Sequence, residues 1–224
     1  MAAKHAVVTG ASGALGRIVC ARLVDEGWTV AAIVHGDAAR APAEAELGLS
    51  ADLASEAKTQ AAFEQIAARL GTLHGLANIA GGFAWETIAD GRAETWDRLY
   101  RLNVRTALNA CRAALPRLAD GASIVNVGAA SAARAEPGMG AYAAAKSGVA
   151  RLTESLAAEL KPRRIRVNAV LPSIIDTPAN RAGMPSADFA KWVTTGELAG
   201  AIAFLLSDQA SGITGASVPV TGRV

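Results

Sequence analysis

The sequence has only two cysteines among its 224 residues, Cys20 and Cys111, and both lie in segments with helical patterning. So few cysteines exclude a disulfide-rich scaffold and indicate buried thiols in a reducing cytoplasm. No apolar run reaches the ~18 residues that a membrane-spanning helix needs. The first ten residues, MAAKHAVVTG, hold no long apolar stretch followed by a cleavage site, so we expect no signal peptide.

Blocks of like charge are also missing. The 22 basic and 20 acidic residues are interspersed and leave a net charge of +2, so we expect neither a nucleic-acid partner nor a membrane partner. The three histidines, His5, His35 and His74, show no metal-ligand spacing with a carboxylate or a cysteine, and no metal site is expected. With 51% hydrophobic and 19% charged residues, the chain reads as one globular domain over residues 1–224.

Strand-like and helix-like segments alternate along the whole chain. The expected strands are continuous apolar runs, at 5–10, 28–34, 47–53, 73–82, 122–129, 165–172 and 216–222. The helical patterns between them cover 14–26, 56–70, 93–118, 140–160 and 196–207. Uninterrupted apolar strands alternating with helices predict an α/β fold: a doubly wound Rossmann-type domain with a seven-stranded parallel sheet, whose ligands bind at the carboxyl ends of the strands. The irregular stretch at about 172–195 follows the sixth strand and is expected to act as a substrate lid.

A glycine-rich turn, TGASGALG at residues 9–16, joins the first strand to the first helix. Glycines in such a turn let the backbone approach a ligand closely, and the helix that follows offers free N–H groups to a pyrophosphate. The turn alone is weak support, but its place at the start of a β-α-β unit favours a dinucleotide cofactor over a purely structural role.

Tyr142 and Lys146 are spaced four residues apart and therefore share one face of a predicted helix. An ammonium group beside a phenol favours the phenolate, so we expect the pKa of Tyr142 to be lowered and the pair to serve as a general acid and base. The alternative is a pair of surface neighbours without a chemical role. The strand and the Pro137-Gly138 turn that precede the pair favour the catalytic interpretation.

Taken together, the ordered motifs resemble the short-chain dehydrogenase/reductase family along essentially the whole chain. They are TGASGALG, ADL with Asp52, NIAGG with Asn78, RLNV with Asn103, YAAAK, NAVLP and ITGASVPVTG. The resemblance implies that Tyr142, Lys146 and Asn103 are catalytic, with Asn103 holding a water in a proton relay. The cofactor-binding residues that it implies are Gly10, Ser12, Gly13, Leu15, Gly16, Asp52, Leu53, Asn78, Ala80, Gly81, Lys146, Pro172, Ile175 and Thr177.

One departure from the family pattern concerns the catalytic serine, which in many members lies thirteen residues before the tyrosine. That position is Ala129 here, and the nearest serine, Ser131, comes two residues later. PGMGAYAAAK and LPSIIDTPANRAGMPSADFAKW (171–192) are similar to the dihydropteridine reductase branch, which also lacks the serine. Its substrate, a quinonoid dihydropterin, develops little alkoxide charge on reduction and needs no hydroxyl to polarise a carbonyl. Phe83 and Trp85 could stack on such a planar ring, although ordinary loop packing is an equal alternative.

The choice between NADP and NAD depends on the end of the second strand. An acidic residue there would bind the ribose 2′-hydroxyl of NAD, but the position is Val34, followed by His35. The sequence therefore leans to NADP, with a 2′-phosphate near His35 or Arg40. The alternative is that Asp37 turns back to hold the ribose of NAD.

The sequence thus predicts a NAD(P)H-dependent oxidoreductase that acts on a small planar substrate such as a quinonoid dihydropterin. One alternative is a carbonyl or 3-oxoacyl reductase in which Ser131 replaces the missing serine. Another is a cofactor-binding sensor without catalysis, which the presence of Tyr142, Lys146 and Asn103 disfavours. The resemblance also implies a homodimer or homotetramer built on the helices at 93–118 and 140–160, where small residues such as Ala143, Ala144 and Ala150 permit close approach.

Overall fold

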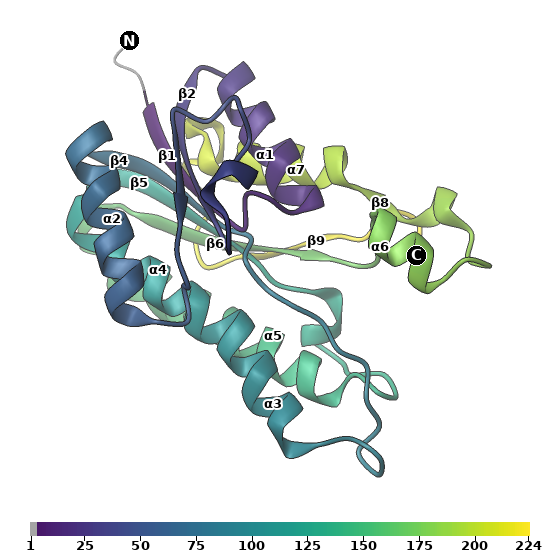
Figure 1. The fold of residues 1–224 in the computed structure, drawn as a ribbon. Helices are drawn as coiled ribbons and strands as arrows, with labels where there is room; N and C mark the ends of the chain where they lie inside the picture. The colour runs from purple at the N-terminus through teal and green to yellow at the C-terminus, as the bar shows by residue number, and fades with distance from the viewer. Residues whose placement is uncertain (1–3) are drawn as a thin grey trace.

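Seven parallel strands form the central sheet of the structure, a computed structural model that describes residues 4–224 (Figure 1). The strands are β1 (Lys4–Thr9), β2 (Trp28–Val34), β3 (Leu47–Ser50), β4 (Leu73–Asn78), β5 (Leu118–Val127), β6 (Arg166–Pro172) and β9 (Ser217–Val220). Their order across the sheet is β3-β2-β1-β4-β5-β6-β9, and every neighbouring pair is parallel. The predicted seven-stranded, doubly wound α/β fold is confirmed.

Helices cover both faces of this sheet. Helices α1 (Ala14–Asp25) and α7 (Thr195–Leu206) lie on one face, and α2 (Glu56–Leu70), α4 (Thr106–Ala114) and α5 (Gly140–Glu159) lie on the other (Figure 1). The side chains of β1 show why its sequence is continuously apolar: Val7 packs into the core beneath α2 and α4, while Ala6 and Val8 pack into the core beneath α1 and α7. Alternate strand residues therefore enter two separate apolar layers.

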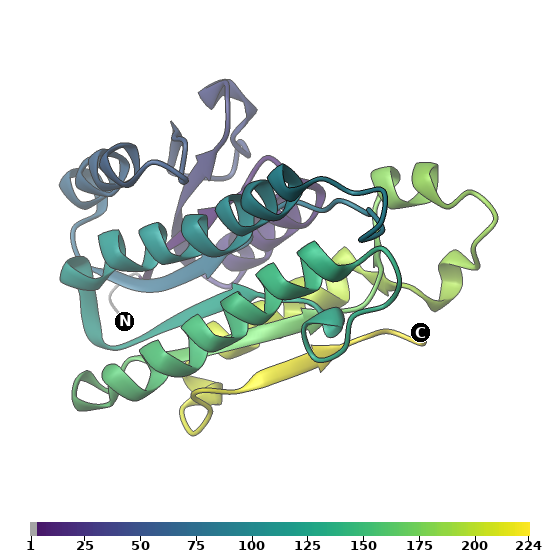
Figure 2. The same ribbon diagram turned by 90° about the horizontal axis from the view of Figure 1, so that it is seen from below.

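The prediction of one continuous helix over residues 93–118 is wrong. The structure has α3 (Ala93–Tyr100), then a π-helical turn over Arg101–Arg105, then α4, and last a 3-10 turn over Leu115–Arg117. The side-chain amide of Asn103 donates to the carbonyl of Leu99, four residues earlier, and so competes with the backbone hydrogen bond of a regular helix. Helix α3 lies side by side with α5 (Figure 2).

The third strand is also shorter than the range predicted for it. It ends at Ser50 rather than at residue 53. The Asp52 carboxylate accepts a hydrogen bond from the Ala54 backbone N–H at 3.0 Å, and Ser55 then caps α2. Local hydrogen bonding by an aspartate of this kind favours a turn over a continued strand.

Two irregular segments project from the carboxyl edge of the sheet, where the strand arrows point in Figure 1. Segment 79–92 follows β4. Segment 173–194 follows β6 and contains α6 (Pro178–Gly183) and a two-stranded sheet of β7 (Ile175–Asp176) and β8 (Val193–Thr194). Over residues 4–224, no helix combines the length and the hydropathy that crossing a membrane requires.

Candidate active site at the carboxyl edge of the sheet

The glycine-rich turn forms a cradle at the end of β1. Gly10 has a φ of 65°, and a Cβ atom there would lie 2.8 Å from the backbone nitrogen of Ala80. At Gly16 a Cβ atom would overlap the carbonyl oxygen of Gly10. Gly13 begins α1 without a side-chain cap, so the N–H groups of the first turn, including that of Leu15, remain available to a pyrophosphate. These residues fit a dinucleotide.

Thr9 ties this cradle to the segment after β4. Its hydroxyl accepts hydrogen bonds from the backbone N–H groups of Ile79 and Ala80, at 3.1 and 3.2 Å. Thr9 is not among the site residues predicted from the sequence. The signal was present, because a threonine directly before the first glycine of the turn ends a strand whose neighbour carries NIAGG.

Tyr142 and Lys146 lie on one face of α5, as predicted. The ammonium of Lys146 is buried and lies 5.8 Å from the centre of the Tyr142 ring, and it donates to the carbonyl oxygen of Val127 at 2.8 Å. A Cβ atom on Gly81 would lie 3.6 Å from the same ammonium. The end of β5, the start of α5 and the segment after β4 therefore meet around Lys146.

The expected lowering of the Tyr142 pKa is wrong for this arrangement. Burial raises the pKa of the Tyr142 phenol to about 12, and burial lowers the pKa of the Lys146 ammonium to about 8. Both shifts have one cause, which is the cost of moving a charge out of water. At neutral pH the phenol carries its proton and is ready to donate it.

Asn103 fixes the segment after β4 rather than pointing into open space. Its amide nitrogen donates to the carbonyl of Gly82 at 3.0 Å, and its amide oxygen accepts from the N–H of Gly82 at 3.3 Å. A Cβ atom on Gly81 would lie 2.6 Å from that oxygen. The side chain is thus used by the protein itself, and the proton-relay role of Asn103 stays a prediction.

Ala129 is buried just after β5, directly before the 3-10 turn, and has no hydroxyl to offer a substrate. Ser131 lies in the 3-10 turn over Ala130–Ala132, and its hydroxyl oxygen is buried without a hydrogen-bond partner among the described residues. A buried polar atom without a partner costs stability and calls for a functional explanation.

The segment after β4 carries two aromatic side chains near the start of α5. The ring of Phe83 meets the Tyr142 ring edge to face, with centroids 4.9 Å apart and planes at 82°. Trp85 packs against Gly138, where any Cβ atom would overlap the indole, and Glu86 donates its backbone N–H to the carbonyl of Gly138 at 2.9 Å. Phe83 and Trp85 nevertheless remain more than half exposed, at 56% and 58%.

Other predicted cofactor residues contribute to the walls of the site in different ways. Leu53 and Asn78 are buried, and the Asn78 amide donates to Asn126 on β5 at 2.9 Å. Pro172 ends β6, Ile175 lies in β7, and Thr177 caps α6 by accepting from the Asn180 N–H.

The loop after β2 lies beside the glycine-rich turn. The exposed carboxylate of Asp37 accepts a hydrogen bond from the Ala39 N–H at 2.9 Å and so caps the 3-10 turn over Ala38–Arg40. The Arg17 guanidinium donates to the carbonyls of Ser12 and Arg40 and so joins the turn to this loop. Arg17 went unnoticed in the sequence, although it directly follows Gly16.

Comparison with known proteins identifies this architecture. A family model described as enoyl-(acyl carrier protein) reductase matches residues 10–222. The 3-oxoacyl-[acyl-carrier-protein] reductase of Staphylococcus aureus is 30% identical, covering 98% of this chain and 97% of that protein, and carbonyl reductase family member 4 of Danio rerio is 31% identical, covering 97% and 96%. The chain belongs to the short-chain dehydrogenase/reductase family.

Solved structures agree with this membership. A short-chain dehydrogenase/reductase from Serratia marcescens has a TM-score of 0.91 and 34% identity over 98% of this chain and 96% of its own. A blue fluorescent protein from a metagenomic library, solved in complex with NADPH, has a TM-score of 0.91 and 31% identity over the same shares. The chain is therefore an NAD(P)-dependent oxidoreductase.

Proposed function

We propose that this short-chain dehydrogenase/reductase reduces a small planar conjugated substrate, of which a quinonoid dihydropterin is the best match, and that Tyr142 and Lys146 do so without a serine. The observation that carries the proposal is the combination of Ala129 at the serine position with the exposed ring of Phe83 on Tyr142. One side of the tyrosine lacks an oxyanion donor, and the other side offers a flat apolar surface.

The bound nicotinamide cofactor supplies the hydride. Tyr142 supplies the proton, because burial keeps its phenol protonated at neutral pH. Lys146 lies close enough for its ammonium to stabilise the phenolate that remains after proton transfer. The buried position of Lys146, between Val127 and Gly81, also suits a contact to the nicotinamide ribose.

The missing serine fits a substrate that develops little oxyanion. Reduction of a simple ketone places negative charge on one oxygen, and a hydrogen-bond donor aimed at that oxygen is worth roughly 3 kcal/mol. Hydride addition to a conjugated imine-like ring spreads the charge over the ring, and the proton goes to nitrogen. Such a substrate needs a proton donor and a stacking surface, which Tyr142 and Phe83 provide.

For the cofactor we propose NADP over NAD, held by Gly10, Ser12, Gly13 and Gly16 in the cradle, with the adenosine lying along Asp52 and Ala80. The Asp37 carboxylate already caps the turn after β2, and β2 itself ends at Val34 rather than at an acidic residue. His35, Arg17 and Arg40 are exposed around the same loop and suit a 2′-phosphate.

A substrate panel tests the proposal. Initial rates are measured with NADPH and with NADH on a quinonoid dihydropterin, a 3-oxoacyl thioester and a simple ketone. We expect the highest kcat/KM on the dihydropterin, and NADPH bound at least as tightly as NADH. A thioester or ketone preferred over the dihydropterin by more than about tenfold contradicts the substrate assignment.

A second candidate function is carbonyl or 3-oxoacyl reduction. The unpartnered buried hydroxyl of Ser131 favours it, because a substrate oxygen could supply the missing partner, and the named activities of the relatives point the same way. The panel separates this candidate by its preferred substrate. Any turnover at all excludes a cofactor-binding sensor.

A further inference from the structure

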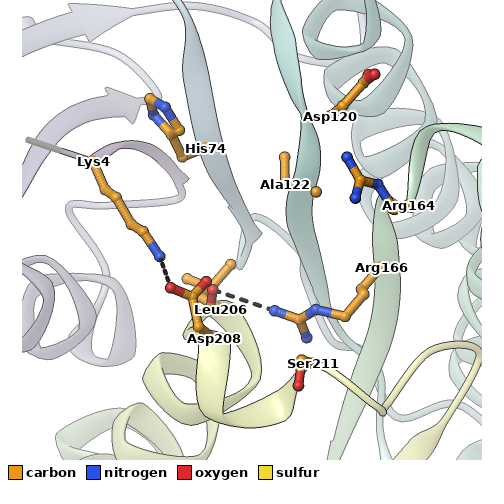
Figure 3. A pocket seen from close by; sticks show the side chains of 10 residues that line it. Lys4, His74, Asp120, Ala122, Arg164, Arg166, Leu206, Asp208 and Ser211 are labelled. Atoms are coloured by element: carbon orange, nitrogen blue, oxygen red, sulfur yellow. Dashed lines mark hydrogen bonds and ion pairs between the residues drawn. The ribbon is translucent and has the colours of Figure 1, made fainter. Parts of the chain in front are cut away.

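A second charged cavity lies at the opposite edge of the sheet from the candidate active site. It encloses about 480 Å³ where β1, β5 and β6 begin, and Lys4, Asp120, Arg164, Arg166 and Asp208 are among the residues that line it (Figure 3). A cavity of this size accommodates a small organic molecule.

The charges around this cavity do not balance. Lys4 pairs with Asp208 at 2.7 Å, and Asp120 pairs with Arg163 at 3.0 Å. Among residues 4–224, neither Arg164 nor Arg166 has a carboxylate oxygen within 4.0 Å. Neither guanidinium therefore forms a close ion pair, although Asp208 lies near enough to Arg166 to interact with it electrostatically. Figure 3 shows both guanidinium groups pointing from the start of β6 toward the cavity.

Arg166 is buried, and its environment uses only part of its hydrogen-bonding capacity. Its guanidinium donates to the carbonyls of Leu205, Leu206 and Ser207, where α7 ends. These three bonds account for three of the five N–H donors that an arginine carries. A buried cation with unused donors is costly without a partner and gains from an anion.

Arg164 adds a separate observation, which is backbone strain. It has a φ of 54° and is the one residue other than glycine with a positive φ among the described residues. The left-handed conformation costs an L-residue roughly 1–2 kcal/mol, whereas glycine adopts it freely. An arginine at this position therefore places a guanidinium at the cavity at the expense of local stability.

We propose that this cavity is a binding site for the phosphate group of a small phosphorylated metabolite. Two guanidinium groups match the paired oxygens of a phosphate in a bidentate manner. Lys4, Arg163, Arg164 and Arg166 at and beside the cavity outnumber the carboxylates of Asp120 and Asp208 by two. This net positive charge would balance the two negative charges of a phosphate monoester near neutral pH. Lys4 lies at the rim of the cavity, where Asp208 holds its ammonium (Figure 3).

Calorimetric titration of the full-length protein with phenyl phosphate, at constant ionic strength, tests the site. Saturating NADPH is present so that the glycine-rich cradle cannot bind the titrant. We expect one binding site per chain. Arg164→Gln should lower the affinity for phenyl phosphate at least about tenfold, because it removes one bidentate charged contact. The matched control is Lys161→Gln, which removes one positive charge from the neighbouring exposed turn outside the cavity lining and should change affinity less than twofold.

Arg164→Gly separates binding from folding. It removes the guanidinium and also relieves the left-handed strain, so we expect phosphate binding to be lost while the unfolding midpoint does not fall. The proposal is overturned if phenyl phosphate does not bind at millimolar concentration, if Lys161→Gln weakens binding as much as Arg164→Gln, or if succinate binds as tightly as the phosphate.

Discussion

At the scale of single residues, the site contains two buried groups whose pKa values shift in opposite directions. Each shift favours the neutral form of the group concerned. Burial raises the pKa of Tyr142 to about 12 and lowers that of Lys146 to about 8. The ordinary gap between a phenol and an ammonium is small, so the protein widens it in favour of a protonated phenol. A protonated phenol suits the direction of reduction, in which the enzyme must give a proton.

Replacing the phenol that we propose as the proton donor tests this residue directly. Tyr142→Phe keeps the ring and removes only the hydroxyl, so we expect kcat to fall by about 10²–10⁴-fold, the usual range for loss of a general acid. Cofactor affinity should stay within about twofold of the parent. Tyr100→Phe is the matched control, since Tyr100 is the other tyrosine and is exposed on α3. Equal losses in both variants would contradict the assignment of Tyr142.

The buried ammonium predicts a pH dependence of stability. Because the folded-state pKa of Lys146 is about 8 against an ordinary 10.5, the unfolded chain holds more protons between these values, and this residue's contribution to stability rises with pH through that window. Lys146→Met removes the contribution. We therefore expect the free energy of unfolding of the variant, relative to that of the parent, to be higher at pH 7 than at pH 10 by on the order of 2 kcal/mol.

Urea unfolding of both proteins at the two pH values measures this difference. The buried thiols of Cys20 and Cys111, whose pKa values burial raises to about 12, act in the opposite sense above pH 9. They are present in both proteins and cancel in the comparison. A pH-independent difference between parent and variant would show that Lys146 keeps its ordinary pKa.

At the scale of elements, the site is assembled by contacts between segments that follow different strands. Thr9 binds the segment after β4, Asn103 in the π-helical turn binds the same segment at Gly82, and Gly138 before α5 receives Trp85 from it. Segment 79–92 is thus fixed at three points. The aromatic pair that it carries is held in place before any substrate arrives.

Gly138→Ala should disturb this arrangement. A Cβ atom at Gly138 overlaps the indole of Trp85, so Trp85 must move and part of the aromatic surface is lost. We expect KM for the planar substrate to rise about two- to tenfold, which corresponds to a lost aromatic contact of 0.5–1.5 kcal/mol, with cofactor affinity unchanged. Steady-state kinetics measure both quantities.

Gly121→Ala controls for backbone strain. Gly121 has a φ of 81°, close to the 76° of Gly138, but a Cβ atom there meets open space. This variant should lose about 1 kcal/mol of stability and keep its KM. If both variants raise KM alike, Trp85 does not shape the substrate site.

At the scale of the whole molecule, one helical face is left open. Trp96 and Tyr100 of α3 are 44% and 51% exposed beside Ala141 and Ala144 of α5, around a hollow of about 250 Å³. The prediction that small residues of the helix at 140–160 form a subunit contact is wrong for Ala143 and Ala150, because both are buried within the chain. The open aromatic face of α3 and α5 is the better support for a homodimer.

Light scattering at micromolar concentration should give a mass of at least twice 22.8 kDa. Ala144→Arg places a charge on the open face and should shift the protein toward the monomer. Ala61→Arg is the matched control, an exposed alanine of α2 on the same side of the sheet but outside this face. A monomeric parent would contradict the proposed dimer.

Much of the fold could be predicted because its signals are local. The strand at 28–34 and the helix at 56–70 have the predicted bounds, since an apolar run and a serine N-cap mark them in the sequence. The contact of Asn103 with Gly82 could not be predicted, because it joins residues that are twenty-one positions apart in the sequence. The direction of the pKa shift of Tyr142 could not be predicted from the sequence either, since it depends on how deeply the folded chain buries the phenol.

The central claim, that reduction proceeds without a serine, is tested most directly by the kcat/KM of Ser131→Ala on a quinonoid dihydropterin and on a simple ketone. We expect the variant to retain the parent's dihydropterin activity within about twofold, because Tyr142 alone delivers the proton. A loss of about 10²-fold or more in a folded variant, the value of a donor to a developing oxyanion, would contradict the account and show that Ser131 has taken the role of the missing serine.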